Sequence, residues 1–186
     1  MEQAFINALP PPAVVIGAEQ PEDRGAREAL LDLAFGPGRF RKTSEKLRRG
    51  RMPAEGLAFT ACKGERLVGT VRLWNIAAGN AGDALLLGPL ATHPELQGRG
   101  IGGRLMAYAI GEATRLGHRA ILLVGDAPYY NRFGFERRFA EGFALPGPVE
   151  ADRFLGLELT AGSLEGATGM VTASGRSLNK ALRRVA

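Results

Sequence analysis

The stretch Gln97-Gly98-Arg99-Gly100-Ile101-Gly102 decides the fold of this chain. An apolar run at residues 84–92 precedes it, and an amphipathic segment that extends to about residue 116 follows it. A strand, a glycine-rich turn and a helix N-terminus in this order are typical of an anion receptor, because the free N–H groups and the helix dipole both favour negative charge. Glycines let the main chain approach a phosphate without an intervening Cβ. The stretch therefore predicts a ligand that carries a diphosphate.

The composition is that of one globular domain. The chain has 186 residues, of which 45% are hydrophobic and 23% are charged. No apolar run reaches the ~18 residues of a membrane span, and residues 1–12 lack the basic segment of a signal peptide. The single cysteine, Cys62, excludes a disulfide framework and a multi-thiolate metal site. We therefore expect a cytoplasmic, metal-free protein with no membrane partner, present as a monomer or a homodimer.

Hydrophobic periodicity predicts a mixed α/β order of elements. Strands are expected at 13–16, 56–62, 66–74, 84–92, 120–124, 135–145 and 153–160. Helices are expected at 21–35 and 43–50, after the glycine stretch to about residue 116, and at 128–133. An antiparallel meander followed by a β-α-β crossover predicts a mixed sheet. We expect a single domain over 1–186, with its core at about 13–145 and an extension at 146–186 that ends in a polar tail from residue 161.

A basic stretch lies between residues 39 and 51. The net charge of the chain is +5. The stretch contains one acidic residue, Glu45, and seven basic residues: Arg39, Arg41, Lys42, Lys46, Arg48, Arg49 and Arg51. Such a density attracts nucleic acid, an acidic substrate or the phosphates of a cofactor. Because no nucleic-acid module or interleaved aromatic residues accompany it, we expect a solvated helix face and no nucleic-acid partner.

The glycines also fit a dinucleotide-binding fingerprint, Gly98-x-Gly100-x-x-Gly103, with Asp126 after the next predicted strand. In a dinucleotide site the first glycine follows the strand directly, whereas residues 93–97 intervene here. The fingerprint also lies past the middle of the chain, which leaves about half the chain for the rest of a doubly wound sheet. The context therefore disfavours a dinucleotide site.

Two motifs together resemble the GCN5-related N-acetyltransferase (GNAT) superfamily. The glycine stretch matches the Gln/Arg-x-x-Gly-x-Gly/Ala loop of that family, and Tyr129-Tyr130-Asn131-Arg132-Phe133-Gly134-Phe135 is similar to its aromatic-Tyr-x-x-x-Gly-Phe signature. The strong resemblance covers about residues 57–135. It implies an α/β fold with a mixed, partly splayed sheet of roughly six to seven strands flanked by helices. It also implies transfer of an acetyl group from acetyl-CoA to a primary amine of a small molecule or a protein.

The resemblance assigns roles to residues of this chain. The main chain of Leu90, Ala91 and Thr92 would bind the pantetheine arm where the strand at 84–92 splays from the strand at 120–124. Tyr130 would lie near the thioester sulfur. The diphosphate would be held by the amides of Gly98, Arg99, Gly100, Ile101, Gly102 and Gly103, with the side chains of Gln97, Arg99 and Arg104 around it.

The expected chemistry is direct attack of an amine on a thioester. A backbone N–H of the splayed strand can stabilise charge on the carbonyl oxygen. A tyrosine, with a pKa of ~10, can act as general acid toward a thiol, with a pKa of ~8.5, so Tyr130 is the expected acid. No covalent enzyme intermediate is needed.

The general base stays open at this stage. Many members of the family carry a glutamate on the strand before the glycine loop, whereas residues 84–91 hold no carboxylate here. Asp126, which follows a predicted strand, is the best placed of the candidates, although its position also suits a helix cap. His93, Glu95 and a water chain are the others. Because a base is not evident, a non-catalytic acyl-CoA-binding or regulatory module is the alternative function.

The acceptor pocket is expected to be formed by residues 36–56 and 136–160.

Overall fold

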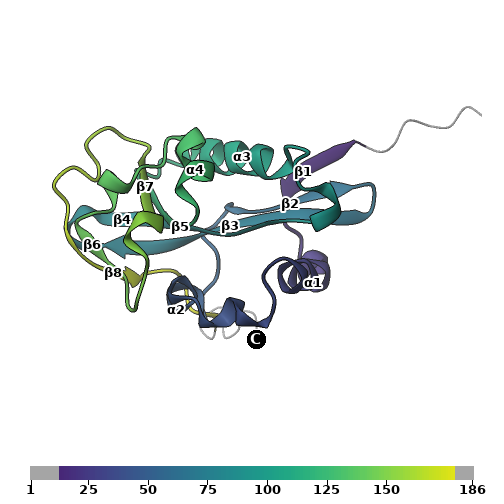
Figure 1. Ribbon diagram of the computed structural model, residues 1–186, viewed down its shortest axis with the longest axis horizontal. Coiled ribbons are helices and arrows are strands. Elements are labelled where there is room, and N and C mark those ends of the chain that lie inside the picture. The colour runs from purple at the N-terminus through teal and green to yellow at the C-terminus, as the bar shows by residue number, and fades with distance from the viewer. Residues whose placement is uncertain (1–12, 179–186) are drawn as a thin grey trace, which may run out of the picture.

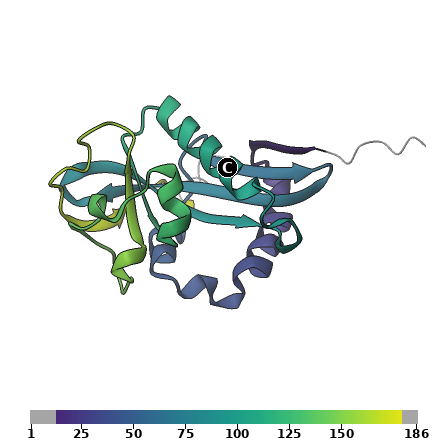
Figure 2. The ribbon, with the colours of Figure 1, turned by 45° about the horizontal axis from the view of Figure 1, so that its top comes forward.

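The computed structural model describes residues 13–178, which form one sheet with helices on both faces. The strands are β1 (Val14–Ala18), β2 (Ala58–Lys63), β3 (Arg66–Ala78), β4 (Gly82–Thr92), β5 (Ala120–Val124), β6 (Phe143–Ala144), β7 (Phe154–Glu158) and β8 (Gly169–Ala173). The helices are α1 (Arg24–Phe35), α2 (Thr43–Arg48), α3 (Ile101–Arg115) and α4 (Ala127–Tyr130). Figure 1 shows α3 and α4 on one side of the sheet and α1 and α2 on the other, and Figure 2 shows the same arrangement from a second angle.

The sheet is mixed, and the predicted fold class is confirmed. Its main path runs β1-β2-β3-β4-β5-β7, and β8 pairs with both β3 and β6. Strands β1 to β4 are antiparallel, β4 and β5 are parallel across the α3 crossover, and β7 returns antiparallel to β5. The sheet has eight strands in the part of the chain that the structure describes. The short β6 and the late β8 raise this number above the six to seven expected.

Strand β4 leaves β5 partway along its length. The two strands pair only at Leu85 and Leu86, while β4 stays paired with β3 as far as Thr92. Gly88 and Pro89 together stand opposite Arg72 of β3, which makes a β-bulge. The indole N–H of buried Trp74 donates to the Gly88 carbonyl oxygen at 2.6 Å. The bulge is thereby anchored, and the sheet is open between β4 and β5, as the predicted splay requires.

Local chemistry sets the ends of the helices. The N–H of Gln20 donates to the Asp23 carboxylate at 2.9 Å within a capping box at the start of a 3-10 turn that leads into α1. Gly36, with a φ of 65°, ends α1. Helix α3 buries an apolar face at spacings of one, three and four residues: Leu105, Met106, Ala109 and Ala113.

The core has a layer on each face of the sheet. Leu85 and Leu87 of β4 pack toward α3, while Leu86 between them packs on the opposite side with Trp74 and Leu47 of α2. This alternation follows from the two-residue period of a strand. Burial on both faces explains why residues 84–87 read as a continuous apolar run.

The C-terminal half differs from the sequence prediction in two places. The strand predicted at 135–145 is wrong: residues 137–139 form a 3-10 turn, closed by the Ala140 N–H on the Arg137 carbonyl oxygen at 2.8 Å. Only Phe143–Ala144 forms a strand there. The polar tail expected from residue 161 contains β8, whose Val171 is fully buried. The lead-in expected at 1–12 and residues 179–186 of the tail lie outside the described residues.

None of the helices between residues 13 and 178 combines the length and the hydrophobicity that a membrane span requires.

We predict that Val171→Ala lowers the free energy of unfolding by about 1–3 kcal/mol, because it removes two buried methyl groups from the core. Met170→Ala is the matched control, because the neighbouring side chain is 50% exposed and should change stability by less than about 0.5 kcal/mol. Urea unfolding measures both variants. Equal effects would show that β8 is not part of the core.

Candidate active site

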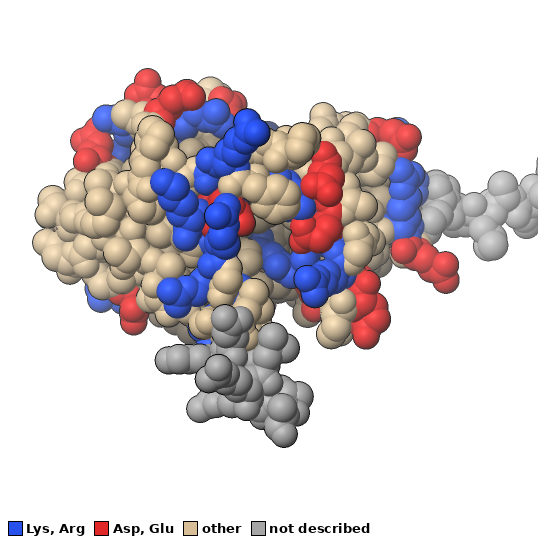
Figure 3. Space-filling model, turned by 90° about the horizontal axis from the view of Figure 1, so that it is seen from below, with Lys and Arg blue, Asp and Glu red and all other residues tan. Residues whose placement is uncertain are grey.

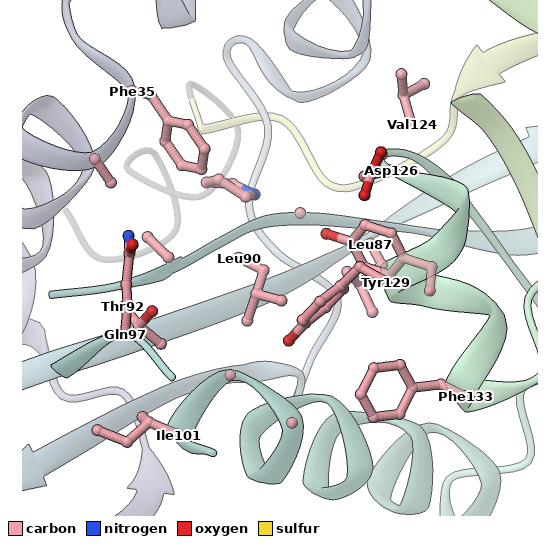
Figure 4. Close-up of a pocket in the computed structure, with 18 of the residues that line it drawn as sticks. Phe35, Leu87, Leu90, Thr92, Gln97, Ile101, Val124, Asp126, Tyr129 and Phe133 are labelled. Atoms are coloured by element: carbon pink, nitrogen blue, oxygen red, sulfur yellow. The ribbon is translucent and has the colours of Figure 1, made fainter. Parts of the chain in front are cut away.

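A cleft of about 910 Å³ lies where β4 separates from β5. One wall comes from the end of α1, the segment that follows it and α2; the rest comes from β4, the glycine loop, the start of α3, the end of β5 and α4. Figure 3 shows the face that carries α1 and α2, where Lys and Arg side chains gather around a hollow. Figure 4 shows Phe35 entering from the α1 side, Tyr129 and Phe133 from the α4 side, and Leu90 and Thr92 of β4 between them.

Most residues that the sequence singled out line this one cleft. Arg99 and Arg104 do not line it. The residues that do are Leu90, Ala91, Thr92, Gln97, Gly98, Gly100, Ile101, Gly102, Gly103, Asp126 and Tyr130. They come from three segments, 90–92, 97–103 and 126–130, and the fold brings them together at the point where the sheet opens.

The glycine loop presents a row of free N–H groups. The amides of Gly98, Gly100, Ile101, Gly102 and Gly103 make no hydrogen bond with another described residue, since the helical ladder begins with the Arg104 N–H on the Gly100 carbonyl oxygen at 3.0 Å. The Arg99 N–H instead donates to the Leu96 carbonyl oxygen at 3.3 Å. Free amides at a helix N-terminus, next to the positive end of its dipole, form a site for an anion.

Three glycines of the loop are required by its geometry. Gly98 and Gly100 have φ values of 75° and 76°, a region that side chains with a Cβ rarely adopt. A Cβ on Gly102 would lie 2.7 Å from the hydroxyl oxygen of Tyr129, which is closer than van der Waals contact permits. Figure 4 shows this hydroxyl directed toward the start of α3.

The backbone of β4 offers donors to the cleft at alternate residues. The His93 N–H donates to the Val68 carbonyl oxygen of β3 at 2.8 Å. Because N–H directions alternate along a strand, Ala91 also points its N–H toward β3, whereas Leu90 and Thr92 point theirs toward the opening. Ala91, predicted with them, therefore lines the cleft without offering its amide to it.

The two arginines predicted around the diphosphate lie elsewhere. The guanidinium of Arg104 donates to the Val14 carbonyl oxygen of β1 at 2.9 Å, on the outer side of α3. Arg99 is exposed, and its side chain is not part of the cleft wall. The reason for Arg104 is helical geometry: it directly follows the last free amide, and its side chain leaves α3 on the side that faces β1 rather than the opening.

Tyr130 is mostly buried at the wall of the cleft, and its hydroxyl has no hydrogen-bond partner among residues 13–178. Burial is the largest of the causes that raise its pKa to about 12; Tyr129 and Asp126 act in the same direction, and the charge of Arg153 acts against them. The ring lies against Gly125, where a Cβ would come within 2.1 Å of a ring carbon. Gly125 therefore leaves the space that this ring fills.

Of the carboxylates considered as a base, only Asp126 lines the cleft. It precedes α4, but its side chain makes no cap hydrogen bond with that helix. His93 and Glu95 do not line the cleft, because the Arg66 guanidinium contacts both of them at 2.8 Å and 3.1 Å on the far side of the loop. Glu45 of α2, which sequence reasoning did not consider as a base, lines the cleft as well.

Sequence reasoning also missed a basic wall opposite α4. Arg39, Lys42 and Arg48 of the basic stretch line the cleft together with Arg153 from the segment before β7. The sequence predicted a solvated helix face for the basic stretch, and Lys42 is indeed exposed; the expectation is not met for Arg39, which is half-buried, or for Arg48, which is buried. Arg48 is only 9% exposed and pairs with Glu45 at 3.2 Å. Arg39 pairs with Asp32 at 2.8 Å and with Glu28.

Within the described range, no group of three or more His, Cys, Asp or Glu side chains is arranged to hold a metal ion. The arrangement can bind an extended ligand whose anionic end meets the amides of the loop. The opposite end of that ligand would reach the bulge at Gly88, the hydroxyl of Tyr130 and the basic wall.

Comparisons with known proteins point to one family. The family model of the acetyltransferase (GNAT) domain matches residues 54–137. An uncharacterized N-acetyltransferase of Escherichia coli, YjhQ, is 40% identical over 65 residues, which are 34% of this chain and 36% of YjhQ. The matched segment thus spans about a third of that relative.

Two further proteins match most of the chain. YhbS, another uncharacterized N-acetyltransferase of Escherichia coli, is 26% identical over 85% of this chain and 95% of its own length. Its crystal structure in complex with CoA superposes with a TM-score of 0.75 at 25% identity, covering 89% of this chain and 92% of YhbS. A GNAT family acetyltransferase of Brucella melitensis, in complex with acetyl-CoA, gives a TM-score of 0.60 at 25% identity over 78% and 88% of the two chains. The expected resemblance to the GNAT superfamily is confirmed.

The buried position of Tyr130 predicts a late ionisation. A raised pKa keeps the phenol of Tyr130 neutral at a pH where an ordinary tyrosine, with a pKa of ~10, already ionises. The tyrosinate absorbance of the wild type and of Tyr130→Phe should therefore coincide up to about pH 11. Above it, the wild type should gain one additional tyrosinate. A difference already present near pH 10 would contradict the burial of this hydroxyl.

Proposed function

We propose that this chain, whose residues 54–137 match the model of the GNAT acetyltransferase domain, transfers the acetyl group of acetyl-CoA to a primary amine by direct attack. The single observation that carries the proposal is the row of free amides on the glycine loop, at one end of a cleft that passes between two separated strands. YhbS, in complex with CoA, and the Brucella protein, in complex with acetyl-CoA, support the choice of donor.

The described residues suit coenzyme A. Its diphosphate binds where main-chain N–H groups can come close to the phosphate oxygens and donate to them. The loop supplies five free N–H groups around Gly98 and Gly100. Its pantetheine arm carries amides, and the N–H groups of Leu90 and Thr92 on the opening edge of β4 provide matching donors. We propose these residues, with Gln97, as the cofactor-binding set. Arg99 and Arg104 lie where they would act through long-range charge alone.

Acetyl-CoA supplies an acetyl group activated as a thioester. Of the two N–H groups that β4 directs into the cleft, that of Leu90 is nearer the bulge and would donate to the carbonyl oxygen, where negative charge develops during attack, which leaves that of Thr92 for the pantetheine arm. Because the donors are main-chain groups of a strand held by β3 and by the Trp74 contact to Gly88, they need little reorganisation. A catalytic nucleophile on the protein is not required.

Tyr130 is the proposed acid toward the departing sulfur. Its pKa of about 12 lies well above the ~8.5 of an ordinary thiol, so complete proton transfer to a thiolate is uphill. Donation of a hydrogen bond from the neutral phenol is therefore its main contribution, and the raised pKa keeps that proton in place at every physiological pH. Asp126 is the proposed base, because its carboxylate lines the cleft and caps no helix.

The amides of the loop can be tested with one pair of variants. Gly102→Ala places a methyl group beside the Tyr129 hydroxyl and at the free amides, and should weaken CoA binding by at least about tenfold. Gly111→Ala, in the same helix with open space around it, should leave CoA affinity unchanged and stabilise the fold by up to about 1 kcal/mol. Calorimetric titration with CoA measures both. Equal affinities would remove the loop from the binding site.

Catalysis can be tested by thiol release from acetyl-CoA in the presence of a panel of primary amines. We expect amine-dependent release that falls about 100-fold in kcat in Tyr130→Phe, while the affinity for CoA changes by less than about threefold. An unchanged kcat would remove the role of Tyr130. Tight CoA binding without release from any amine would instead support the alternative, a non-catalytic acyl-CoA-binding module.

A further inference from the structure

The wall of the cleft formed by α2 and its neighbours carries more positive charge than its own carboxylates neutralise. Among the described residues, the cleft is lined by five basic side chains and two acidic ones, Glu45 and Asp126. The five are Arg39, Lys42, Arg48, Arg132 and Arg153. Arg132 stacks on the rings of Tyr129 and Phe133, and Arg39 is held by Glu28 and Asp32. Three cations remain to be accounted for.

Arg48 is the most constrained of the three. Its side chain is nine-tenths buried, and its Nε has no hydrogen-bond partner in the described structure. Only Nη2 is engaged, with Ser44 and Glu45, while Nη1 lies 3.6 Å from the position that a Cβ of Gly88 would occupy. Burying a guanidinium with unused donors is costly unless an acceptor completes it. The unused donors point to a ligand at the bulge.

Lys42 and Arg153 extend the positive charge from Arg48 toward Tyr130. Neither forms an ion pair with a described carboxylate, and the Lys42 ammonium lies 4.5 Å from the ring centre of Phe35. Burial and the charges of Arg153 and Arg48 lower the pKa of Lys42, and the charge of Arg153 also acts on Tyr130. The three cations therefore share one space, and that space adjoins the proposed acid.

The position along β4 separates this cluster from the phosphates of the donor. Gly88 and Thr92 are four residues apart on an extended strand, roughly 13 Å, and the glycine loop begins farther on. Arg48 thus lies at the thioester end of the cleft, far from the free amides. In Figure 3 blue side chains lie to the left of and below the hollow on the face that carries α1 and α2, the side opposite α3, and red side chains border its right side.

We infer that the acetyl acceptor is a small acidic amine, whose own carboxylate or phosphate lies a few atoms from its amino group and binds Arg48, with Lys42 and Arg153 around it. The inference rests on the proposed function, which identifies the amino group of the acceptor as the group that reacts with the thioester. An arginine fork matches a planar carboxylate or a phosphate in geometry and charge. Anchoring the acid at the bulge would leave the amine directed along the cleft toward the thioester.

The test measures binding rather than turnover, so it is independent of whether acetyl transfer occurs. Amino acids are compared with their amides, in which a neutral carboxamide replaces the carboxylate, and phosphoethanolamine with ethanolamine, by calorimetric titration of the protein with and without saturating CoA. We expect the acidic member of a pair to bind roughly 10- to 100-fold more tightly, as a charge-assisted hydrogen bond at a buried site provides. The amino-acid arm and the phosphate arm distinguish a carboxylate from a phosphate as the anchor.

Variants identify the residues responsible. The preference for the acid should be lost in Arg48→Gln and reduced in Lys42→Gln, and Arg48→Lys should retain part of it. Arg41→Gln is the matched control, because it removes one charge from the same stretch at an exposed residue that does not line the cleft. Thermal unfolding checks that each variant folds. If Arg48→Gln does not fold, Lys42→Gln, which changes an exposed residue, tests the inference in its place.

Three results would overturn the inference: equal or tighter binding of the amines that lack the acidic group, binding of neither series, or a preference that survives both Arg48→Gln and Lys42→Gln. Absence of thiol release with a preserved preference would count against the proposed function alone.

Discussion

The separation of β4 from β5 is the constraint on which the rest of the molecule depends. Two parallel strands that pair at only two positions leave the polar edge of β4 without a partner beyond Leu86. An unpaired edge inside a domain is costly, and here it persists because β3 holds the other edge as far as Thr92 and Trp74 holds the bulge at Gly88. The cleft, its donors and the position of the glycine loop all follow from this one opening.

The two walls of the cleft come from parts of the fold with different chemistry. The α3 wall is made of main-chain donors and glycines, which suit a ligand that is the same throughout a family. The opposite wall is made of side chains from α2 and the segment before β7, and these are charged and long. Under the proposed function, recognition of the donor would rely on backbone geometry, whereas recognition of the acceptor would rely on side chains that can be exchanged without altering the sheet.

The sequence predicted many of the residues that line the glycine-loop side of the cleft, because their signals are local. Gly98 and Gly100 are needed for a left-handed backbone, and Tyr130 belongs to a motif within seven consecutive residues. The basic wall was not foreseen, because Arg48 meets Gly88 only through the docking of α2 against the sheet. Nor was β8, since the apolar signal of Val171 stands among polar and exposed neighbours. Long-range pairing leaves little trace in a window of a few residues.

The pairing of the late strand β8 with β3 also affects the order in which parts of the chain fold. Strand β8 pairs with Ile76, Ala77 and Ala78, nearly a hundred residues earlier, and the segment after it bonds to the flank of α2: the Met52 N–H donates to Arg176 and the Leu178 N–H to Gly50. Closing so long a loop is slow compared with forming a hairpin. On a ribosome, the meander and the glycine loop are synthesised many residues before α2 can gain these contacts, so a nascent chain completes the loop side of the cleft first and the basic wall last.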